Sequence, residues 1–307
     1  MLKILQTLPT KYFGILQSYL KSRYLTITCN NETSSPIPML SGVPRGSILG
    51  PPLYTLYTAD IPQSPLTTLS TYADDKAVFS THHNPDTASS NLQHHIQSID
   101  QWTQKWRLKI NVTKSKHIIF TLRRGHCPPV NFNKAAIPRA ESIKYLGLHF
   151  DKQLNWKKHV TTTRKHLDLK SREINWLIGK HSPLSMPNTL LIYKTVLRPV
   201  WTYGIELWGL SNINIIQRYQ SKMLRSITNA PWYVTNQSLY QDLRIPLVRT
   251  VYRERTAAHH ATLRAHTNPL VETLLKPPSN RRLKVRPHRT RSAAADCGLC
   301  PLRNVTF

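Results

Sequence analysis

Two adjacent carboxylates, Asp74 and Asp75, stand between short apolar, β-prone stretches in the segment STYADDKAVF. Neighbouring residues on a regular strand face opposite sides, so both carboxylates reach one centre only where the chain turns. The flanks at 69–72 and 77–79 predict the two arms of a hairpin. A solvated turn is the simplest interpretation, because Asp is common in turns. The chemical alternative is a site for Mg²⁺, which favours a few carboxylates together with substrate phosphates.

A glycine-rich segment, SGVPRGSILGPP at 41–52, precedes the acidic pair. Its glycines at 42, 46 and 50 fit a simple loop, and they also permit close approach of the backbone to a nucleotide or template strand. Downstream, in LKINVTKSKHIIF, Lys114 and Lys116 directly precede an apolar strand, where a lysine can reach a triphosphate. This context favours the chemical interpretation of Asp74 and Asp75.

The charge of the chain indicates the kind of partner. Its 307 residues include 42 Lys and Arg against 15 Asp and Glu, a formal charge of +27. Neutralising phosphates and releasing their counterions makes such a charge useful, so nucleic acid is the leading partner and a membrane surface the weaker one. We find no apolar run long enough to span a bilayer and no signal-peptide pattern. We therefore expect an intracellular protein with no membrane segment.

The four cysteines are too few and too scattered for a disulfide framework. Cys297 and Cys300, in CGLC, have metal-ligand spacing, with His288 as the nearest further candidate ligand. Structural zinc requires four nitrogen or sulfur ligands. A pair of reduced thiols is therefore the favoured interpretation, with zinc as the alternative.

The elements expected around these motifs change type along the chain. Residues 3–24 predict helix with a break at Pro9, and residues 24–40 then predict strands. The apolar spacing in NLQHHIQSIDQWTQKW, at 91–106, predicts a helix, while KHIIFTL and KYLGLHF predict strands. We therefore expect an α+β fold in which helices cover one face of an antiparallel sheet.

From about residue 153 the pattern becomes mainly helical and strongly basic. Its aromatic residues are interpreted as core rather than as platforms for stacking bases; they are Trp176, Tyr193, Trp201, Tyr203, Trp208 and Tyr219. Past about 276, low apolar content and clustered like charge predict a disordered tail. A phosphate-binding arm and a sequence without a selected role both remain open for this tail.

The ordered motifs resemble the reverse transcriptases of non-LTR retrotransposons, most closely those of the jockey type. GVPRGSILGP resembles the family's template- and nucleotide-contacting motif, YADD its catalytic hairpin, INVTKSK its following Asn/Lys motif and YLGLHFD its primer-gripping strand pair. The resemblance covers roughly residues 5–260. Four motifs in the expected order are specific, whereas any one alone is not.

The resemblance implies a partial right-hand polymerase palm over residues 1–152, a helical thumb and connection over 153–275, and a basic tail over 276–307. Asp74 and Asp75 are the implied catalytic residues and metal ligands, with Mg²⁺ as cofactor and Mn²⁺ as an alternative. Lys114 is the implied assistant of the leaving pyrophosphate. The implied nucleotide and template contacts are Gly42, Pro44, Arg45, Gly46 and Tyr72, and the implied primer grip is Tyr145, Leu146 and Gly147.

Two residues depart from the family pattern. Arg45 stands where Gln is usual, and Lys76 stands where a small polar residue is usual, so that its charge would compete with a metal ion. The family carries a further catalytic Asp on an earlier strand, and we find no match to that strand in these residues. We therefore expect an N-terminally truncated chain that is inactive alone, with Asp60 as the nearest substitute ligand.

The leading hypothesis is an RNA-directed DNA polymerase region that acts by two-metal nucleotidyl transfer. Its implied partners are an RNA template, a DNA primer and dNTPs, and the family resemblance implies a nuclear location. The alternative is a non-catalytic, nucleic-acid-binding remnant of such an element. A structural or chromatin-associated basic protein explains the charge but not the four motifs. The sequence indicates no oligomeric state.

Overall fold

The computed structural model describes residues 3, 6, 8–44, 46–121, 127–133, 135–268, 271–275 and 305–306. These residues form helices and small antiparallel sheets, which confirms the α+β class. The chain divides into two compact units. Unit 1 comprises residues 1–112 and 128–137 with residue 307, and unit 2 comprises 113–127 and 138–306. The predicted palm, thumb and tail boundaries remain predictions.

The core of unit 1 forms on one face of helix α4, Pro85–Lys105. Asn84 begins the helix, because its side chain accepts a hydrogen bond from the Asp86 N–H at 2.9 Å. The predicted helix is thus confirmed and starts earlier than the apolar spacing suggested. Side chains three or four residues apart make up the buried face; its core residues are Leu92, Ile96, Ile99 and Trp102, packed with Ile61, Val78, Val130, Phe132 and Ile137.

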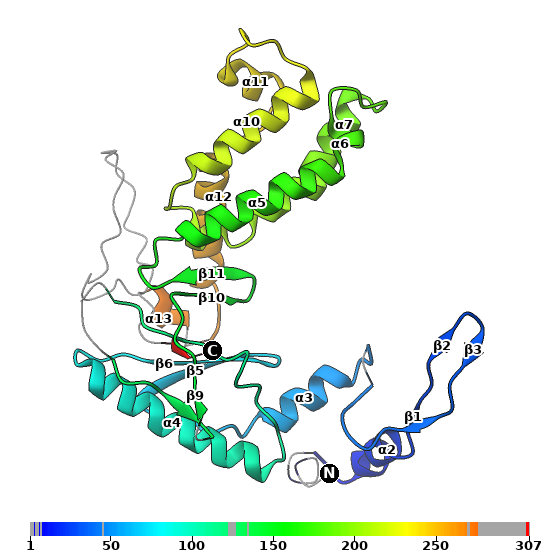
Figure 1. Cartoon of the computed structure of the whole chain (residues 1–307), viewed down its shortest axis with the longest axis vertical. Helices are drawn as coiled ribbons and strands as arrows, with labels where there is room; N and C mark the ends of the chain where they lie inside the picture. The colour runs from blue at the N-terminus through cyan, green and yellow to red at the C-terminus, as the bar shows by residue number, and fades with distance from the viewer. Residues whose placement is uncertain are drawn as a thin grey trace. The chain divides into compact units, whose positions relative to one another are not determined.

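Strands β5, Thr67–Tyr72, and β6, Asp75–Ser80, form an antiparallel hairpin that packs on α4 (Figure 1). We call it the acidic hairpin. Its base is anchored by His95 of α4, which is 1% exposed. The His95 Nε2–H donates to the Pro62 carbonyl at 2.9 Å, so Nδ1 accepts from the Thr67 hydroxyl at 2.5 Å. The base of the hairpin is therefore held by a buried side chain.

Before this hairpin, helix α2, Lys11–Leu20, leads into an exposed β arm (Figure 1). In this arm, β1, Tyr24–Leu25, pairs with β4, Ile37–Pro38, and β2, Thr28–Cys29, pairs with β3, Glu32–Thr33. Asn30 and Asn31 both adopt positive φ, of 50° and 66°, as a tight hairpin turn of primed type requires. All strand residues of the arm are exposed. Helix α3, Gly50–Thr58, then begins at the end of the glycine-rich segment.

Short strands follow α4. The pair β8, Asn131–Phe132, and β9, Ala135–Ala136, belongs to unit 1. In unit 2, β7, His117–Ile118, pairs with β12, Val305–Thr306. Apart from β12, the tail over 276–307 lies outside the described residues, and so do Cys297 and Cys300.

Unit 2 continues with a second hairpin and a set of helices (Figure 1). Strands β10, Ser142–Tyr145, and β11, Leu148–Asp151, pair antiparallel, so KYLGLHF contains two strands and their turn. The helices are α5 Lys157–Glu173, α6 Asn175–Ile178, α7 Met186–Ile192, the π-helix η1 Tyr193–Leu197, α8 Arg198–Thr202, α9 Ile205–Trp208, α10 Asn214–Thr228, α11 Asn236–Asp242, α12 Val248–Arg264 and α13 Glu272–Leu275. Within the described ranges, none of the helices has the length and apolarity needed to cross a membrane.

Aromatic residues dominate the core of unit 2. Tyr193, Trp201 and Trp208 are fully buried, and Tyr219 is 1% exposed, which confirms their interpretation as core. That interpretation is wrong for Trp176 and Tyr203, which are 69% and 53% exposed. Thr189, Tyr193, Leu197 and Trp201, each four residues from the next, are all buried along the continuous run α7–η1–α8.

Candidate active site

The tip of the acidic hairpin carries both candidate catalytic carboxylates. Tyr72 pairs with Asp75 as the last rung, so Ala73 and Asp74 form a two-residue turn and the predicted hairpin is confirmed. Ala73 has a φ of 50°, a left-handed conformation that costs a residue other than glycine on the order of 1 kcal/mol. Asp74 and Asp75 are exposed, and Tyr72 is 66% exposed. The turn thus presents a tyrosine and two acids to solvent on a strained tip.

The donor chemistry of this tip fits a hard divalent cation. Carboxylate oxygens are the ligands that Mg²⁺ prefers, together with substrate phosphates and water. Among the described residues, the carboxylates of Asp74 and Asp75 form no side-chain hydrogen bond or ion pair. In the same part of the chain, no three His, Cys, Asp or Glu side chains gather as a metal site. The pair therefore offers part of a coordination shell.

Lys76, the departure beside the acidic pair, is directed toward helix α3. Its Nζ donates to the Tyr54 hydroxyl at 3.2 Å and lies 5.5 Å from the centroid of the Tyr54 ring. Tyr54 is four residues beyond Gly50, or about one helical turn into α3. This contact links the acidic hairpin to the helix that follows the glycine-rich loop.

The glycine-rich loop itself depends on backbone conformation. Gly42 and Gly46 have φ values of 82° and 79°, and a Cβ at either position would meet nothing within 4 Å. Glycine is thus required by the backbone and not by crowding. The Arg23 guanidinium donates to the Gly42 carbonyl at 2.7 Å, while the Ser47 hydroxyl, bonded to Tyr19, accepts from the Leu49 N–H at 3.1 Å. Pro44 is half-buried in this loop, and Arg45 lies outside the described residues.

Asp60, the candidate substitute ligand, is engaged by other side chains. Its Oδ1 accepts from Lys3 Nζ at 2.5 Å and from the Trp102 indole N–H at 3.2 Å. Lys3 is 6% exposed, and its Nζ also lies over the rings of Trp106, Tyr57 and Trp102 at 3.8, 4.7 and 4.8 Å. Burial raises the pKa of Asp60, but the hydrogen bonds from Lys3 and Trp102 outweigh it and lower that pKa below its ordinary value. Asp60 therefore serves an ion pair in unit 1.

The other predicted site residues belong to unit 2. Lys114 is exposed in a turn before β7. The candidate primer grip forms the turn between β10 and β11, where Tyr145 pairs with Leu148. Leu146 and Gly147, the two turn residues, have φ values of 45° and 79°. The structure thus brings Tyr72, Asp74, Asp75 and the glycine-rich loop together in one unit, and the primer grip and Lys114 belong to the other.

Tyr203 and Gly204, absent from the sequence prediction, hold the tip of the β10–β11 hairpin, which we call the grip hairpin. The Tyr203 hydroxyl donates to the Leu146 carbonyl at 2.7 Å. A Cβ on Gly147 would lie 3.0 Å from a ring carbon of Tyr203, and a Cβ on Gly204 would lie 2.9 Å from Leu148. The only sequence signal for this contact is a Tyr-Gly pair that interrupts a helical pattern.

Comparison with known proteins identifies the family. Residues 3–150 match the family model described as reverse transcriptase (RNA-dependent DNA polymerase). The chain belongs to the reverse transcriptase family. As a jockey-like reverse transcriptase chain, it carries the hairpin, the glycine-rich loop and most of the grip hairpin within the matched residues.

Relatives from Drosophila melanogaster extend the similarity beyond residue 150. The probable RNA-directed DNA polymerase from transposon X-element is 38% identical over 296 residues, covering 94% of this chain and 33% of the relative. The RNA-directed DNA polymerase from mobile element jockey is 32% identical, covering 87% and 30%. The probable RNA-directed DNA polymerase from transposon BS is also 32% identical, covering 92% and 33%. This reverse transcriptase chain thus spans about a third of the length of these relatives.

A histidine pair connects the grip hairpin of the reverse transcriptase chain to helix α5. His159 of α5 is 5% exposed, and its Nδ1 accepts from the His149 N–H at 3.4 Å. Its ring lies 5.6 Å from Trp208 and 6.2 Å from Trp156, centroid to centroid. Burial and the neighbouring His149 lower the pKa of His159 to about 4. Burial, followed by the charges of Lys144 and Lys158, also lowers the pKa of His149. Because the donor is the backbone amide of His149, this contact depends on a neutral His159 imidazole and not on the His149 ring.

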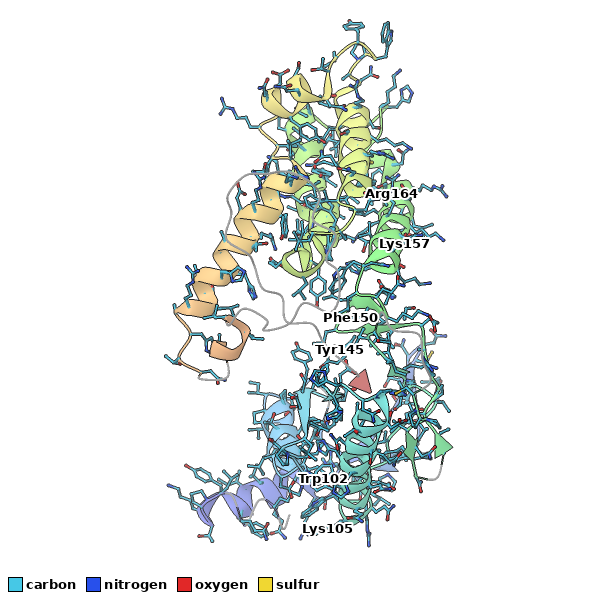
Figure 2. All side chains as sticks on the ribbon, turned by 90° about the vertical axis from the view of Figure 1, so that its left-hand side faces the viewer. Trp102, Lys105, Tyr145, Phe150, Lys157 and Arg164 are labelled. Carbon is cyan, nitrogen blue, oxygen red and sulfur yellow. The ribbon has the colours of Figure 1, made fainter. Side chains whose placement is uncertain are left out.

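The basic residues of α5 begin directly after the grip hairpin. Figure 2 labels Tyr145 and Phe150 on the hairpin, and Lys157 and Arg164 along α5. Arg164 forms a two-pronged pair with Asp168, at 2.8 and 3.0 Å, and its guanidinium carbon lies 4.9 Å from the Tyr219 ring centroid. Other lysines and arginines of this helix are exposed or half-buried; they are Lys157, Lys158, Lys165, Lys170 and Arg172. Their spacing gives the reverse transcriptase a cationic helix surface.

Proposed function

We propose that this chain supplies the catalytic hairpin and a nucleic-acid-binding helical region of an RNA-directed DNA polymerase. The acidic hairpin carries the proposal. Asp74 and Asp75 are exposed beside Tyr72 at its strained two-residue turn, and the base of the hairpin is anchored to the buried His95. The left-handed Ala73 and the two adjacent carboxylates each lower the stability of the fold. A site that keeps both features despite this cost is more often functional, which favours a chemical role for the tip. The family match and the names of the relatives support the same proposal.

In this proposal, Asp74 and Asp75 hold Mg²⁺ or Mn²⁺. Such ions, when bound, favour activation of the primer 3′-hydroxyl and stabilise the leaving phosphate. Tyr72 lies beside the primer end, and Lys114 assists the leaving pyrophosphate. The left-handed Gly42 and Gly46, with open space above their α carbons, allow a nucleotide or template strand to approach the backbone near Pro44 and Arg45.

The proposed partners are an RNA template, a DNA primer and dNTPs, and the proposed location is the nucleus. The grip hairpin, through Tyr145, Leu146 and Gly147, positions the primer. With +27 net charge, the chain binds RNA or an RNA–DNA hybrid mainly through phosphates, with weak sequence preference. We expect the affinity to fall steeply with salt in a titration by fluorescence anisotropy. Affinity that stays constant as salt rises would contradict phosphate binding.

We also infer that residues 1–307 alone give no measurable primer extension. Two-metal transfer places two ions at one centre, and among the described residues no third His, Cys, Asp or Glu side chain joins the acidic pair there to complete their near-octahedral coordination. Displacement of a reacting group by about 1 Å lowers a rate on the order of 100-fold. The assay is extension of a labelled primer on an RNA template. Synthesis by residues 1–307 that required Asp74 would contradict this inference.

The decisive experiment is Asp74→Asn in a polymerase polypeptide that contains this chain and extends primers. Asparagine keeps the shape of the side chain and removes its charge, so extension should fall at least about 1,000-fold while RNA affinity changes less than about twofold. The matched control is Asp86→Asn, which removes an exposed carboxylate near the start of α4. Extension that survives Asp74→Asn would reject the metal-binding role, and retained RNA binding would then favour a non-catalytic remnant.

A further inference from the structure

The loop at residues 229–235 joins α10 to α11 (Figure 1). It carries an exposed aromatic pair. Trp232 is 91% exposed and Tyr233 is 69% exposed. Their ring centroids are 6.0 Å apart, and the rings are nearly perpendicular at 81°. Tryptophan is usually largely buried, so a tryptophan held this far out of a core requires an explanation.

The loop that carries this pair is built by specific hydrogen bonds. The Arg225 guanidinium donates to the carbonyls of Pro231 and Val234 and to Asn236 Oδ1, the first at 3.1 Å and the last at 3.2 Å. Asn229 ends α10 in the left-handed conformation, and the Thr235 hydroxyl caps α11 by accepting from the Ser238 N–H at 3.1 Å. The aromatic pair is therefore presented by a loop whose backbone is held by hydrogen bonds, so that little backbone freedom is left to lose on binding.

A cationic cavity lies between α5 and α10, the helix that leads into this loop. Its volume is about 390 Å³, and Arg172, Lys222 and Ser226 are among the residues that line it. Ser226 is three residues before Asn229, so the cavity reaches the end of α10 where the loop starts. Asp168 also lines the cavity, but Arg164 neutralises it through two hydrogen bonds. Arg172 and Lys222 are exposed and leave the cavity positively charged.

The charge of the segment from α5 to α10 indicates the class of partner. Residues 164–226 contain ten Lys and Arg against three acids, Asp168, Glu173 and Glu206. A single-stranded nucleic acid carries phosphates at regular intervals and unpaired bases between them. Cations bind its phosphates, and exposed aromatic side chains stack on its bases. A protein interface would instead be depleted of lysine relative to the rest of the surface.

We propose that Trp232 and Tyr233 form a stacking platform for unpaired nucleotides of RNA, whose phosphates bind Arg172 and Lys222. The proposal rests on the nucleic-acid binding proposed above and adds a site on the helical unit that is distinct from the acidic hairpin. Stacking requires a free base face, so the platform favours single-stranded RNA over duplex. Arg225 is a positioning residue that fixes the loop and does not contact the RNA.

The test uses the whole 307-residue chain and fluorescence anisotropy with a labelled oligouridylate of about 16 nucleotides, and with a duplex RNA of the same length. The double substitution Trp232→Ala with Tyr233→Ala should weaken single-strand binding about tenfold or more. Duplex affinity should change less than about twofold, because phosphate contacts remain. Trp176→Ala, which removes another exposed tryptophan of unit 2, is the matched control and should leave both affinities unchanged.

Each result decides between distinct conclusions. If the unsubstituted chain binds neither RNA, the proposed nucleic-acid function is rejected, and the platform with it. If the chain binds RNA and the double variant binds single strands equally well, only the platform is rejected. An equal loss in the Trp176→Ala control would also reject it, because any exposed tryptophan would then suffice. An unchanged melting temperature of the double variant shows that a loss of affinity does not come from unfolding, since both side chains are exposed.

Discussion

The acidic hairpin and the grip hairpin share one backbone plan and differ in what surrounds their tips. Each has two antiparallel strands, a two-residue turn and a non-glycine residue with positive φ, namely Ala73 at 50° and Leu146 at 45°. The tip of the grip hairpin is fixed by the Tyr203 hydroxyl and packed against its ring. The tip of the acidic hairpin has its carboxylates exposed, and its anchoring contact to His95 lies at the opposite end.

This difference shows how one local structure serves two purposes. The contacts around the grip hairpin hold its strained turn in one conformation, which does not depend on a bound ligand. The acidic hairpin has a fixed base and an exposed end, which suits side chains that must meet a ligand. Disturbing the packing around the grip hairpin should therefore cost more stability than disturbing the acidic tip.

The largest expected effect is loss of stability of unit 2 in acid. Burial lowers the pKa of His159 to about 4, and burial with the charge of Arg139 does the same for His117. Each histidine has a pKa of about 6.5 in the unfolded chain and about 4 in the folded chain. Between pH 6.5 and pH 4, the unfolded chain therefore binds protons that the folded chain does not. The free energy of unfolding is therefore highest above about pH 6.5 and falls as the pH drops towards 4, by about 3 kcal/mol for each histidine.

Urea unfolding at pH 7 and at pH 4.5, followed by tryptophan fluorescence, measures this loss. His159→Phe keeps a buried ring without a titrating group and should weaken the pH dependence. An unchanged dependence in that variant would remove His159 from the explanation. In unit 1, the lowered pKa of Asp60 means that its ionised carboxylate stabilises the folded state. This stabilisation is lost only as the pH falls below about 4, outside the range in which the histidines act.

The next effect concerns the turn of the grip hairpin. Gly147→Ala places a Cβ at a φ of 79° and 3.0 Å from the Tyr203 ring, so we expect a destabilisation of roughly 1–3 kcal/mol. Gly46→Ala is a matched control with φ 79° and no atom within 4 Å of the added Cβ. Thermal unfolding should show the larger loss for Gly147→Ala. Equal losses would mean that the Tyr203 contact adds nothing to the conformational strain.

A smaller effect is expected from Tyr203→Phe, which removes the hydrogen bond to the Leu146 carbonyl and keeps the ring. The free energy of unfolding should fall by about 1 kcal/mol. Amide hydrogen exchange should rise in the grip hairpin, whereas exchange in the acidic hairpin should stay as it was. Faster exchange in both hairpins would contradict a local role for this hydrogen bond.

The smallest effect is expected from Ala73→Gly at the acidic tip. Glycine adopts the left-handed φ of 50° without a Cβ clash but gains freedom in the unfolded chain, so the net change should stay within about 1 kcal/mol of zero. Calorimetry measures the change. A destabilisation above about 2 kcal/mol would show that packing holds this tip as firmly as it holds the grip hairpin.

Local pattern predicted much of this arrangement. The acidic hairpin followed from two β-prone flanks around Tyr-Ala-Asp-Asp, and α4 followed from apolar residues three and four apart. The contacts that hold these elements were not predictable, because they join distant residues: Lys3 with Asp60, Thr67 with His95, and Tyr203 with Leu146. The exposure of Trp232 was not predicted either, because no sequence pattern distinguishes an exposed tryptophan from a buried one.

The π-helical turn at Tyr193–Leu197 bears on how this region can change in length over evolution. Four residues of α-helix advance about 400°, so a stripe spaced by four drifts about 40° at each step. The buried positions Thr189, Tyr193, Leu197 and Trp201 stay on one side because the π turn accommodates an additional residue. Deleting one residue from this turn would give the spacing four, three, four, which an ordinary helix buries equally well. A single-residue gap between homologues is therefore expected here, where it leaves the aromatic core intact.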